Sequence, residues 1–231
     1  MFDSGHGKNR IIHRDTLKRQ GVQNATTLNY VCTVPNFQYT WKLLMGDLRD
    51  RSLAPVDALE GMRSLSLESQ QLGLEDMELP CSLEHLTLPS VCNFNLPRNL
   101  QTLTFGDRFN EVGVDLPDTL QKLTFGEDFN QSLRYWSLPQ NLVILTFGCN
   151  FNQSLKHVRL PQKLQVLTFG NQFNQSSDGV CFLHGLLTLT FGDSFDQKLE
   201  GVDFPDALEQ LTLGRDFDQA IEAVNWPNQL K

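Results

Sequence analysis

The sequence has no long hydrophobic run. Hydrophobic residues make up 40% of its 231 positions, but they occur in stretches of only a few residues. A membrane-spanning helix needs roughly 20 consecutive, mostly apolar residues. Residues 1–21 are polar and basic with no apolar centre, so they do not look like a secretory signal peptide. We therefore expect no membrane contact and an intracellular, cytoplasmic protein.

Cysteine and histidine are scarce, and neither shows the spacing of a structural or metal site. The five cysteines are an odd number and include no C-x-x-C pair. That pattern favours free thiols in a reducing compartment over a disulfide framework. The five histidines have no metal-ligand spacing, so we expect no metal ion.

Catalytic motifs are missing as well. Ile11–Asp15 reads IIHRD, as in a kinase catalytic loop, but Thr16 stands where Leu belongs and only twelve residues precede His13. Gly5–Lys8 reads GHGK, but Asn9 replaces the Ser or Thr of a phosphate-binding loop. No Ser/His/Asp or Cys/His set can be assembled. We predict a protein that is not an enzyme and has neither catalytic residues nor a cofactor.

Charge is distributed unevenly along the chain. Residues 1–55 carry eight Lys or Arg against four Asp or Glu, a net of +4. Residues 56–231 carry eleven against twenty-three, a net of −12. An acidic body repels phosphate backbones, so a nucleic-acid partner is not expected.

What the sequence does contain is an internal repeat. The phrase LTFGEDFNQS at residues 123–132 returns as LTFGCNFNQS and LTFGNQFNQS at intervals of 22 residues. The full unit is L-P-x-x-L-x-x-L-T-F-G-x-x-F-N-Q-S-L-x-x-V-x, and a degenerate copy covers residues 58–78. The clearer copies begin at Leu79, Leu96, Leu116, Leu138, Leu160, Phe182, Phe204 and Trp226.

Each unit predicts one short strand and two turns. The segment L-x-x-L-T-F alternates apolar and polar residues at its end, as a half-buried strand does. A glycine follows each strand, and we expect it to supply a positive φ in a turn. A proline opens the next approach to the strand, where a missing N–H does no harm.

One unit cannot be stable alone. Its seven or so apolar positions would contribute on the order of 10–20 kcal/mol when fully buried. Fixing 22 backbones costs roughly 1–2 kcal/mol per residue, so the balance is unfavourable. Stacking solves the problem, because parallel strands about 4.8 Å apart bury like residues in continuous rows. We predict a mostly β, parallel solenoid with one strand per 22-residue coil.

The stacked rows have chemical identities. Two rows of phenylalanine, which we predict to be core rather than a cofactor site, follow the strands at Phe105, Phe125, Phe147, Phe169 and Phe191, and at Phe109, Phe129, Phe151, Phe173, Phe195 and Phe217. We expect Asn110, Asn130, Asn152 and Asn174 to point inward and bond to turn backbone. Asp196 and Asp218 continue that row. They reflect drift near an end, or they make that end bind a cation or fray at neutral pH.

These motifs resemble the leucine-rich-repeat superfamily and, within it, proteins with FNIP repeats. The resemblance rests on L-P-x-x-L-x-x-L-T-F-G-x-x-F-N-Q, which is nearly intact in the units that begin at residues 116, 138 and 160. Gln-Ser follows the Phe-Asn pair where the family name implies Ile-Pro. The resemblance implies a leucine-rich-repeat-type solenoid used for protein–protein contact. Residues 1–57 show no F-box, so a ubiquitin-ligase role is not implied.

A partner on such a solenoid is expected to meet the face formed by the strands. Several outward positions on adjacent coils are apolar although the scaffold does not require it, and a contiguous exposed apolar patch suggests a contact site. Relaxed drift, or a side covered by another segment, would explain the same residues. The predicted partner-binding residues are Lys122, Val143, Ile144, Gln165, Val166 and Leu187.

The two ends of the chain lead to separate expectations. Residues 1–57 form a basic segment, either a cap or partly disordered, in which residues 28–34 could be a strand and residues 39–48 a short helix. Residues 58–231 form the solenoid, with seven coils and an incomplete eighth. A last coil without a cap leaves a strand edge open, which would permit self-association or indicate a fragment of a longer array.

The sequence thus predicts a non-catalytic scaffold that binds a protein partner of unknown identity on its strand face. The alternative is a structural or adhesive repeat element of a larger protein, with no discrete ligand. A saturable partner on the strand face would separate the two.

Overall fold

The computed structural model describes residues 27–30, 63–67, 79–88 and 95–231. In those ranges, no helix is both long and apolar enough to cross a membrane. The helix predicted at residues 39–48 lies outside the described residues. The elements are β1 (Thr27–Tyr30), β2 (Ser64–Leu67), β3 (His85–Leu88), β4 (Thr102–Phe105), β5 (Lys122–Thr124), η1 (Leu133–Tyr135), β6 (Ile144–Thr146), β7 (Val166–Thr168), β8 (Thr188–Thr190) and β9 (Gln210–Thr212).

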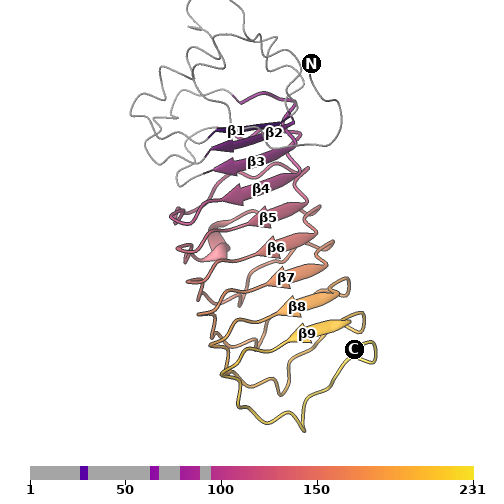
Figure 1. Ribbon diagram of the computed structural model, residues 1–231. Helices are drawn as coiled ribbons and strands as arrows, with labels where there is room; N and C mark the ends of the chain where they lie inside the picture. Colours follow the sequence, from indigo (N-terminus) through magenta and orange to yellow (C-terminus); the bar gives the residue numbers. More distant parts are fainter. Residues whose placement is uncertain (1–26, 31–62, 68–78, 89–94) are drawn as a thin grey trace, which may run out of the picture.

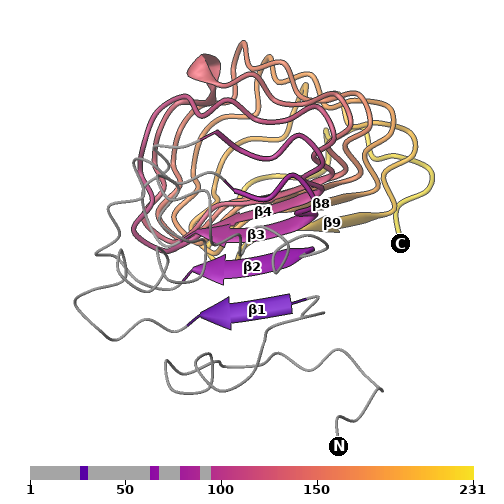
Figure 2. The ribbon, with the colours of Figure 1, turned by 90° about the horizontal axis from the view of Figure 1, so that it is seen from above.

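All nine strands form one parallel sheet in the order of the sequence (Figure 1). The register aligns like with like, so that Leu123 lies beside Leu145 and Thr124 beside Thr146. Seen from above, the strands occupy one side of each coil and the connecting segments arch over the other (Figure 2). The predicted mostly β, parallel solenoid with one strand per coil is confirmed.

The sheet extends into the N-terminal segment. Strand β1 pairs in parallel with β2, and its Leu28 lies opposite Leu65. Sequence analysis had suggested a strand in this region as part of a cap. The pairing makes β1 a further rung of the same sheet.

A short turn leads the chain into each strand from β3 to β9. In the P-x-x-L segments the leucine N–H donates to the proline carbonyl, for example Leu120 to Pro117 at 3.1 Å and Leu142 to Pro139 at 3.1 Å. The missing N–H of proline costs no hydrogen bond at this position, and the fixed φ of proline suits the turn. The leucine side chain then points inward and is fully buried.

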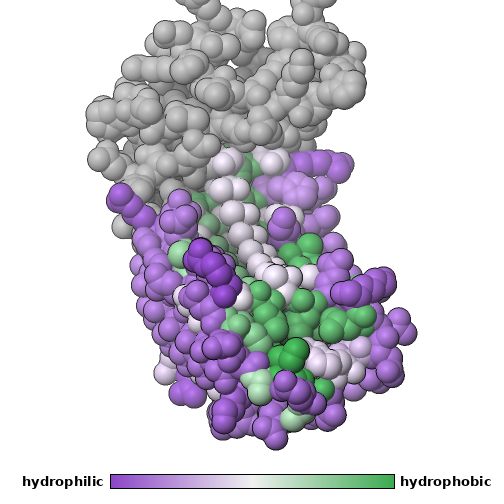
Figure 3. All heavy atoms as spheres, turned by 60° about the horizontal axis from the view of Figure 1, so that its bottom comes forward, coloured by the Kyte–Doolittle hydropathy of each residue, from purple (hydrophilic) through white to green (hydrophobic). Residues whose placement is uncertain are grey.

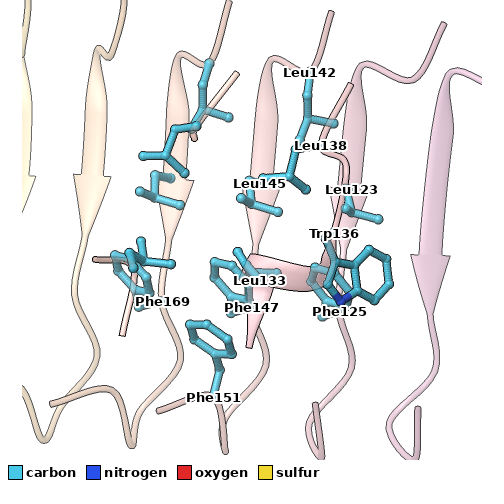
Figure 4. Close-up of a cluster of buried hydrophobic side chains, with 14 of the residues drawn as sticks. Leu123, Phe125, Leu133, Trp136, Leu138, Leu142, Leu145, Phe147, Phe151 and Phe169 are labelled. Carbon is cyan, nitrogen blue, oxygen red and sulfur yellow. The ribbon is translucent and has the colours of Figure 1, made fainter. Parts of the chain in front are cut away.

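The two phenylalanine rows form the centre of the core, as predicted. Within one coil Phe125 stacks on Phe129 with ring centroids 3.8 Å apart. Between coils Phe125 stacks on Phe147 at 5.5 Å, and the two rings are almost parallel (Figure 4). Offset stacking of this kind adds roughly 0.5–1.5 kcal/mol per pair to the burial of the rings. The rows therefore hold neighbouring coils in a single register.

One coil departs from the repeat and carries η1. Trp136 follows this turn and stands perpendicular to the phenylalanine rows, 5.2 Å from Phe125 and 5.8 Å from Phe129 between ring centroids. It is 8% exposed, and its Nε1 is the one buried side-chain polar atom without a hydrogen-bond partner in the described part of the chain. The surrounding ring faces offer this N–H only a weak acceptor. Trp136 thus anchors the turn, while Tyr135 stays 66% exposed.

The glycine after each strand has a different role from the one predicted. Positive φ values occur among the described glycines only at Gly113, Gly179 and Gly201, so the repeated glycine does not supply a left-handed turn. A Cβ added to Gly148 would overlap the carbonyl group of Gly126, and the next coils repeat this arrangement. Glycine is required because the backbones of successive coils approach each other too closely for any side chain.

We therefore expect Gly148→Ala to lower the free energy of unfolding by about 3 kcal/mol, since backbone must move to relieve the overlap. Gly185→Ala is the matched control. A Cβ at Gly185 would be 3.6 Å from its nearest neighbour, the Gln162 carbonyl oxygen, so a change within about 0.5 kcal/mol is expected. Chemical denaturation followed by circular dichroism measures both. Equal midpoints for Gly148→Ala and the wild type would contradict the close-approach explanation.

Candidate protein-binding surface

The outer face of the sheet consists of parallel columns of side chains, one member per coil. We call the residue directly before each strand the approach column, and the approach column together with the outward residues of the strands the strand face. The first strand residues include Thr102, Lys122, Ile144, Val166, Thr188 and Gln210. From β3 to β9, the third strand residues are Thr87, Thr104, Thr124, Thr146, Thr168, Thr190 and Thr212.

The predicted partner-binding residues of the first strand position lie side by side. Lys122 pairs with Ile144, and Ile144 pairs with Val166. Lys122 is exposed, whereas Ile144 and Val166 are half-buried. The two aliphatic side chains thus form a short apolar stripe with a cation at one end.

The other predicted residues occupy the approach column of the same coils. The backbone N–H groups of Gln165 and Val166 both donate to the Val143 carbonyl, at 2.9 and 3.1 Å. The Leu187 N–H donates to the Gln165 carbonyl at 2.9 Å, which places Leu187 one coil further on. The structure therefore brings all six predicted residues together on four consecutive coils.

Sequence analysis missed a groove beside this face. A hollow of about 780 Å³ runs over six coils along the approach column and includes Val143, one of the six predicted partner-binding residues. Its second wall consists of residues from the P-x-x-L turns, which sequence analysis had treated only as a way into the strand. The sequence did contain a signal for this wall, because successive units have a polar residue at the same turn position: Asn99, Thr119 and Asn141.

The asparagine row is a hydrogen-bonded ladder, but it does not lie in the interior. Asn130 is exposed and Asn152 is half-buried, so the expectation of an inward row is wrong. The Oδ1 of Asn130 accepts the backbone N–H of Asn152 at 3.0 Å and the Nε2 of Gln153 at 3.0 Å. The same pair of bonds joins the next coils. Each side chain thus acts on the following coil as an acceptor.

This geometry explains why aspartate can replace asparagine at 196. The Oδ1 of Asp196 accepts the Asp218 N–H at 3.0 Å and the Gln219 Nε2 at 2.8 Å. Because the ladder uses only an acceptor oxygen, the missing amide donor costs nothing there. These two bonds, led by that from the Asp218 backbone, hold the pKa of Asp196 below its usual value.

The described residues contain no group of three or more His, Cys, Asp or Glu side chains that could hold a metal ion. Asp196 belongs instead to the ladder, in which its carboxylate accepts hydrogen bonds from the Asp218 N–H and the Gln219 Nε2. The prediction of a cation at Asp196 and Asp218 therefore has no geometric support in this part of the chain.

The last coil exposes positions that are buried elsewhere. Ile221 is 46% exposed, whereas Leu199, at the same position one coil earlier, is fully buried. Leu211 and Phe217 are half-buried, although their counterparts Leu189 and Phe195 are fully buried. Figure 3 shows hydrophobic residues gathered at this end of the solenoid and bordered by hydrophilic ones.

Comparison with known proteins agrees with this architecture. The FNIP Repeat family matches residues 112–150, 151–194 and 195–231, together 120 of the 231 residues. A solved structure described as "The crystal structure of CroV588 a novel circular LRR protein structure" is similar, with a TM-score of 0.65 and 38% identity. The similarity covers 74% of this chain and 26% of that one, so the chain spans about a quarter of that protein's length. No curated protein matches the chain.

The ladder makes the last coil sensitive to acid. Since the folded-state pKa of Asp196 lies below its ordinary value of 3.8, the bonds to the last coil are fully present above that value. Their charge-assisted part is lost as the pH falls through the folded-state pKa, because the protonated carboxyl keeps only a neutral acceptor oxygen. We expect the Asp218 and Gln219 amide resonances to shift with this titration in an NMR series from about pH 6 to about pH 2.

Asp196→Asn is the control, because asparagine keeps the acceptor oxygen and does not ionise. In Asp196→Asn, the Asp218 and Gln219 amide resonances should show no titration of a group at position 196. An identical titration in the wild type and in Asp196→Asn would show that Asp196 does not hold the last coil.

Proposed function

The chain belongs to the FNIP-repeat family, and on that premise we propose that it is a non-catalytic scaffold whose strand face binds a protein partner. Solenoids of this type use their extended repeated surfaces for contact with other proteins. The binding residues would be Lys122, Val143, Ile144, Gln165, Val166 and Leu187.

One observation carries the proposal. Val143, Ile144, Val166 and Leu187 are aliphatic side chains on consecutive coils, at positions that the coil does not bury. The corresponding positions on the preceding coils hold Gln101, Thr102, Gln121 and Lys122, so the scaffold itself imposes no hydrophobic side chain there. A hydrophobic centre with a polar border is typical of a protein-binding surface.

We also propose that the protein works in a reducing compartment, the cytoplasm. Cys81, Cys149 and Cys181 are free, and Cys81 and Cys181 are exposed. Exposed unpaired thiols persist where glutathione and thioredoxin keep them reduced. The described part of the chain has no disulfide that would favour an oxidising compartment.

The strand-face proposal is tested by affinity capture from a native lysate with Ile144→Glu/Val166→Glu. Two carboxylates in the apolar stripe would have to lose their hydration in a complex, so specific partners of the wild type should be lost. Circular dichroism must show that both proteins fold alike.

Val112→Glu/Tyr135→Glu is the matched control, since it places the same two charges on exposed side chains away from the strands. Val112 is 57% exposed, and Tyr135 belongs to η1 on the arch of the coil (Figure 2). This control should capture the wild-type partners. If the strand-face variant captures the same proteins, or the wild type captures none, the alternative of a structural repeat element without a discrete ligand is favoured.

Self-association through the last coil is a second proposal, supported by the partial exposure of Ile221, Leu211 and Phe217. A parallel strand such as β9 with an open edge offers backbone groups to another chain. Sedimentation velocity should show a concentration-dependent rise in mass that Ile221→Asp reduces. A molecular mass that stays at the monomer value up to about 100 times the lowest detectable protein concentration would contradict self-association.

A further inference from the structure

The groove along the approach column is a hollow of which the proposed function uses only Val143. Its volume of about 780 Å³ lies within the range of roughly 300–1,000 Å³ that is usual for ligand sites. Its lining comes from six successive coils, so it runs along the solenoid and across the strands. At about 4.8 Å between coils and about 3.3 Å per extended residue, it has the length of roughly seven residues of a peptide.

Two columns of side chains form its walls. One wall is the approach column, from Glu84 to Val143. The other wall, which we call the turn column, consists of residues two positions after a proline and one position before an inward-pointing leucine: Ser82, Asn99, Thr119, Asn141 and Lys163. Because that leucine points inward, the backbone of each coil lies between the walls.

The groove ends where the turn column loses its side chains. After Lys163 the same position holds Gly185 and then Ala207. Neither residue can build a wall, so the hollow is confined to the coils before them.

Hydrogen bonds to the preceding coil fix the turn column. The Asn99 Nδ2 donates to the Cys81 carbonyl at 2.9 Å, and the Asn141 Nδ2 donates to the Asp118 carbonyl at 2.8 Å. The Thr119 hydroxyl lies 2.8 Å from the Leu100 carbonyl. These contacts use the amide nitrogens of the asparagines, and the Asn141 Oδ1 accepts from the Lys163 Nζ at 2.8 Å. A wall fixed in this way is ordered before any ligand arrives, which lowers the cost of binding.

The facing approach column, in contrast, has unused hydrogen-bonding groups. The side chains of Gln101 and Gln121 make no hydrogen bond within the described part of the chain; Gln101 is half-buried and Gln121 is exposed. A glutamine amide offers the same donors and acceptor as a peptide group. Two such amides on adjacent coils can therefore bond to the backbone of a chain that lies along the groove.

The charges that line the groove indicate which kind of polypeptide would fit it. The groove is lined by Arg63 and Lys163, and its one acid, Glu84, is paired with Arg63 at 3.1 Å. Lys163 keeps donors to spare after bonding to the Asn141 Oδ1 at 2.8 Å. Lys122 lies directly beside Gln121. With Arg63 paired to Glu84, the lining has a net charge of +1, from Lys163, on a body of net charge −12 over residues 56–231, which favours a single local carboxylate over a long polyanion such as a nucleic acid.

We propose that the groove binds an extended acidic segment of a polypeptide. Gln101 and Gln121 bond to its backbone, and Lys163 meets one of its carboxylates. The site shares Val143 with the strand face but does not depend on a partner there, so either site can exist without the other.

The probe is a fluorescent octapeptide of alternating Glu and Thr, with a Lys-Thr octapeptide as the charge control, and fluorescence anisotropy measures binding. The wild-type chain should bind the Glu-Thr peptide and not the Lys-Thr peptide, and its affinity should fall as salt is added. Gln101→Ala/Gln121→Ala should weaken binding about tenfold, and Lys163→Glu by at least as much.

Two further variants separate this site from other effects. Gln229→Ala changes an exposed glutamine at the turn-column position of the last coil, outside the groove, and should leave the affinity unchanged. Val166→Ser alters the strand face without adding charge and should also leave it unchanged. It thereby separates failure of the groove from failure of the strand-face proposal.

The proposal is overturned if the Glu-Thr peptide does not bind at millimolar concentration, or if the Lys-Thr peptide binds equally well. Binding that survives both groove variants would also overturn it. Circular dichroism of Gln101→Ala/Gln121→Ala guards against unfolding, which is not expected because neither side chain holds another coil.

Discussion

The close contact between the backbones of successive coils is the constraint on which the other features depend. At each glycine after a strand, one coil rests on the carbonyl group of the coil before it. This contact fixes the distance and the offset between coils, so like residues must face like residues. The phenylalanine stacks, the leucine register and the asparagine ladder all require that offset. A side chain at the glycine position would therefore disturb several interactions at once.

The repeated contacts divide the residues of a coil into two groups. Positions that contact the next coil must stay nearly constant, because a side chain there packs against the residue at the same position of the neighbouring coil. The ladder shows how narrow the tolerance is, since Asp196 is accepted only because its bonds use an acceptor oxygen. Positions in the approach and turn columns vary more between coils, for example from Gln121 to Val143 and from Lys163 to Gly185. Binding properties can change in these columns without a change in the scaffold.

Much of the fold could be predicted from the repeat, because burial of the leucine and phenylalanine rows requires stacked parallel strands. The rest depended on distances that no spacing reveals. The glycines looked like turn residues, yet their φ values are ordinary and close approach explains them. The asparagines looked buried because they follow a buried phenylalanine, yet their ladder lies at the surface. The groove was missed because its walls come from two positions on either side of an inward leucine, and only the coil geometry brings them together.

The apolar part of the strand face and the groove are joined through Val143, which belongs to both. On the N-terminal side of this residue the approach column presents the amides of Gln101 and Gln121, and on its C-terminal side the outward, half-buried residues include Ile144, Val166 and Leu187. A partner that carries an acidic extended segment next to an apolar surface could occupy both parts at once. Linking two weak contacts in one partner raises the overall affinity without any new contact, provided that the partner can span both. The rigid register of the coils meets that condition, since it holds the two parts at a fixed separation.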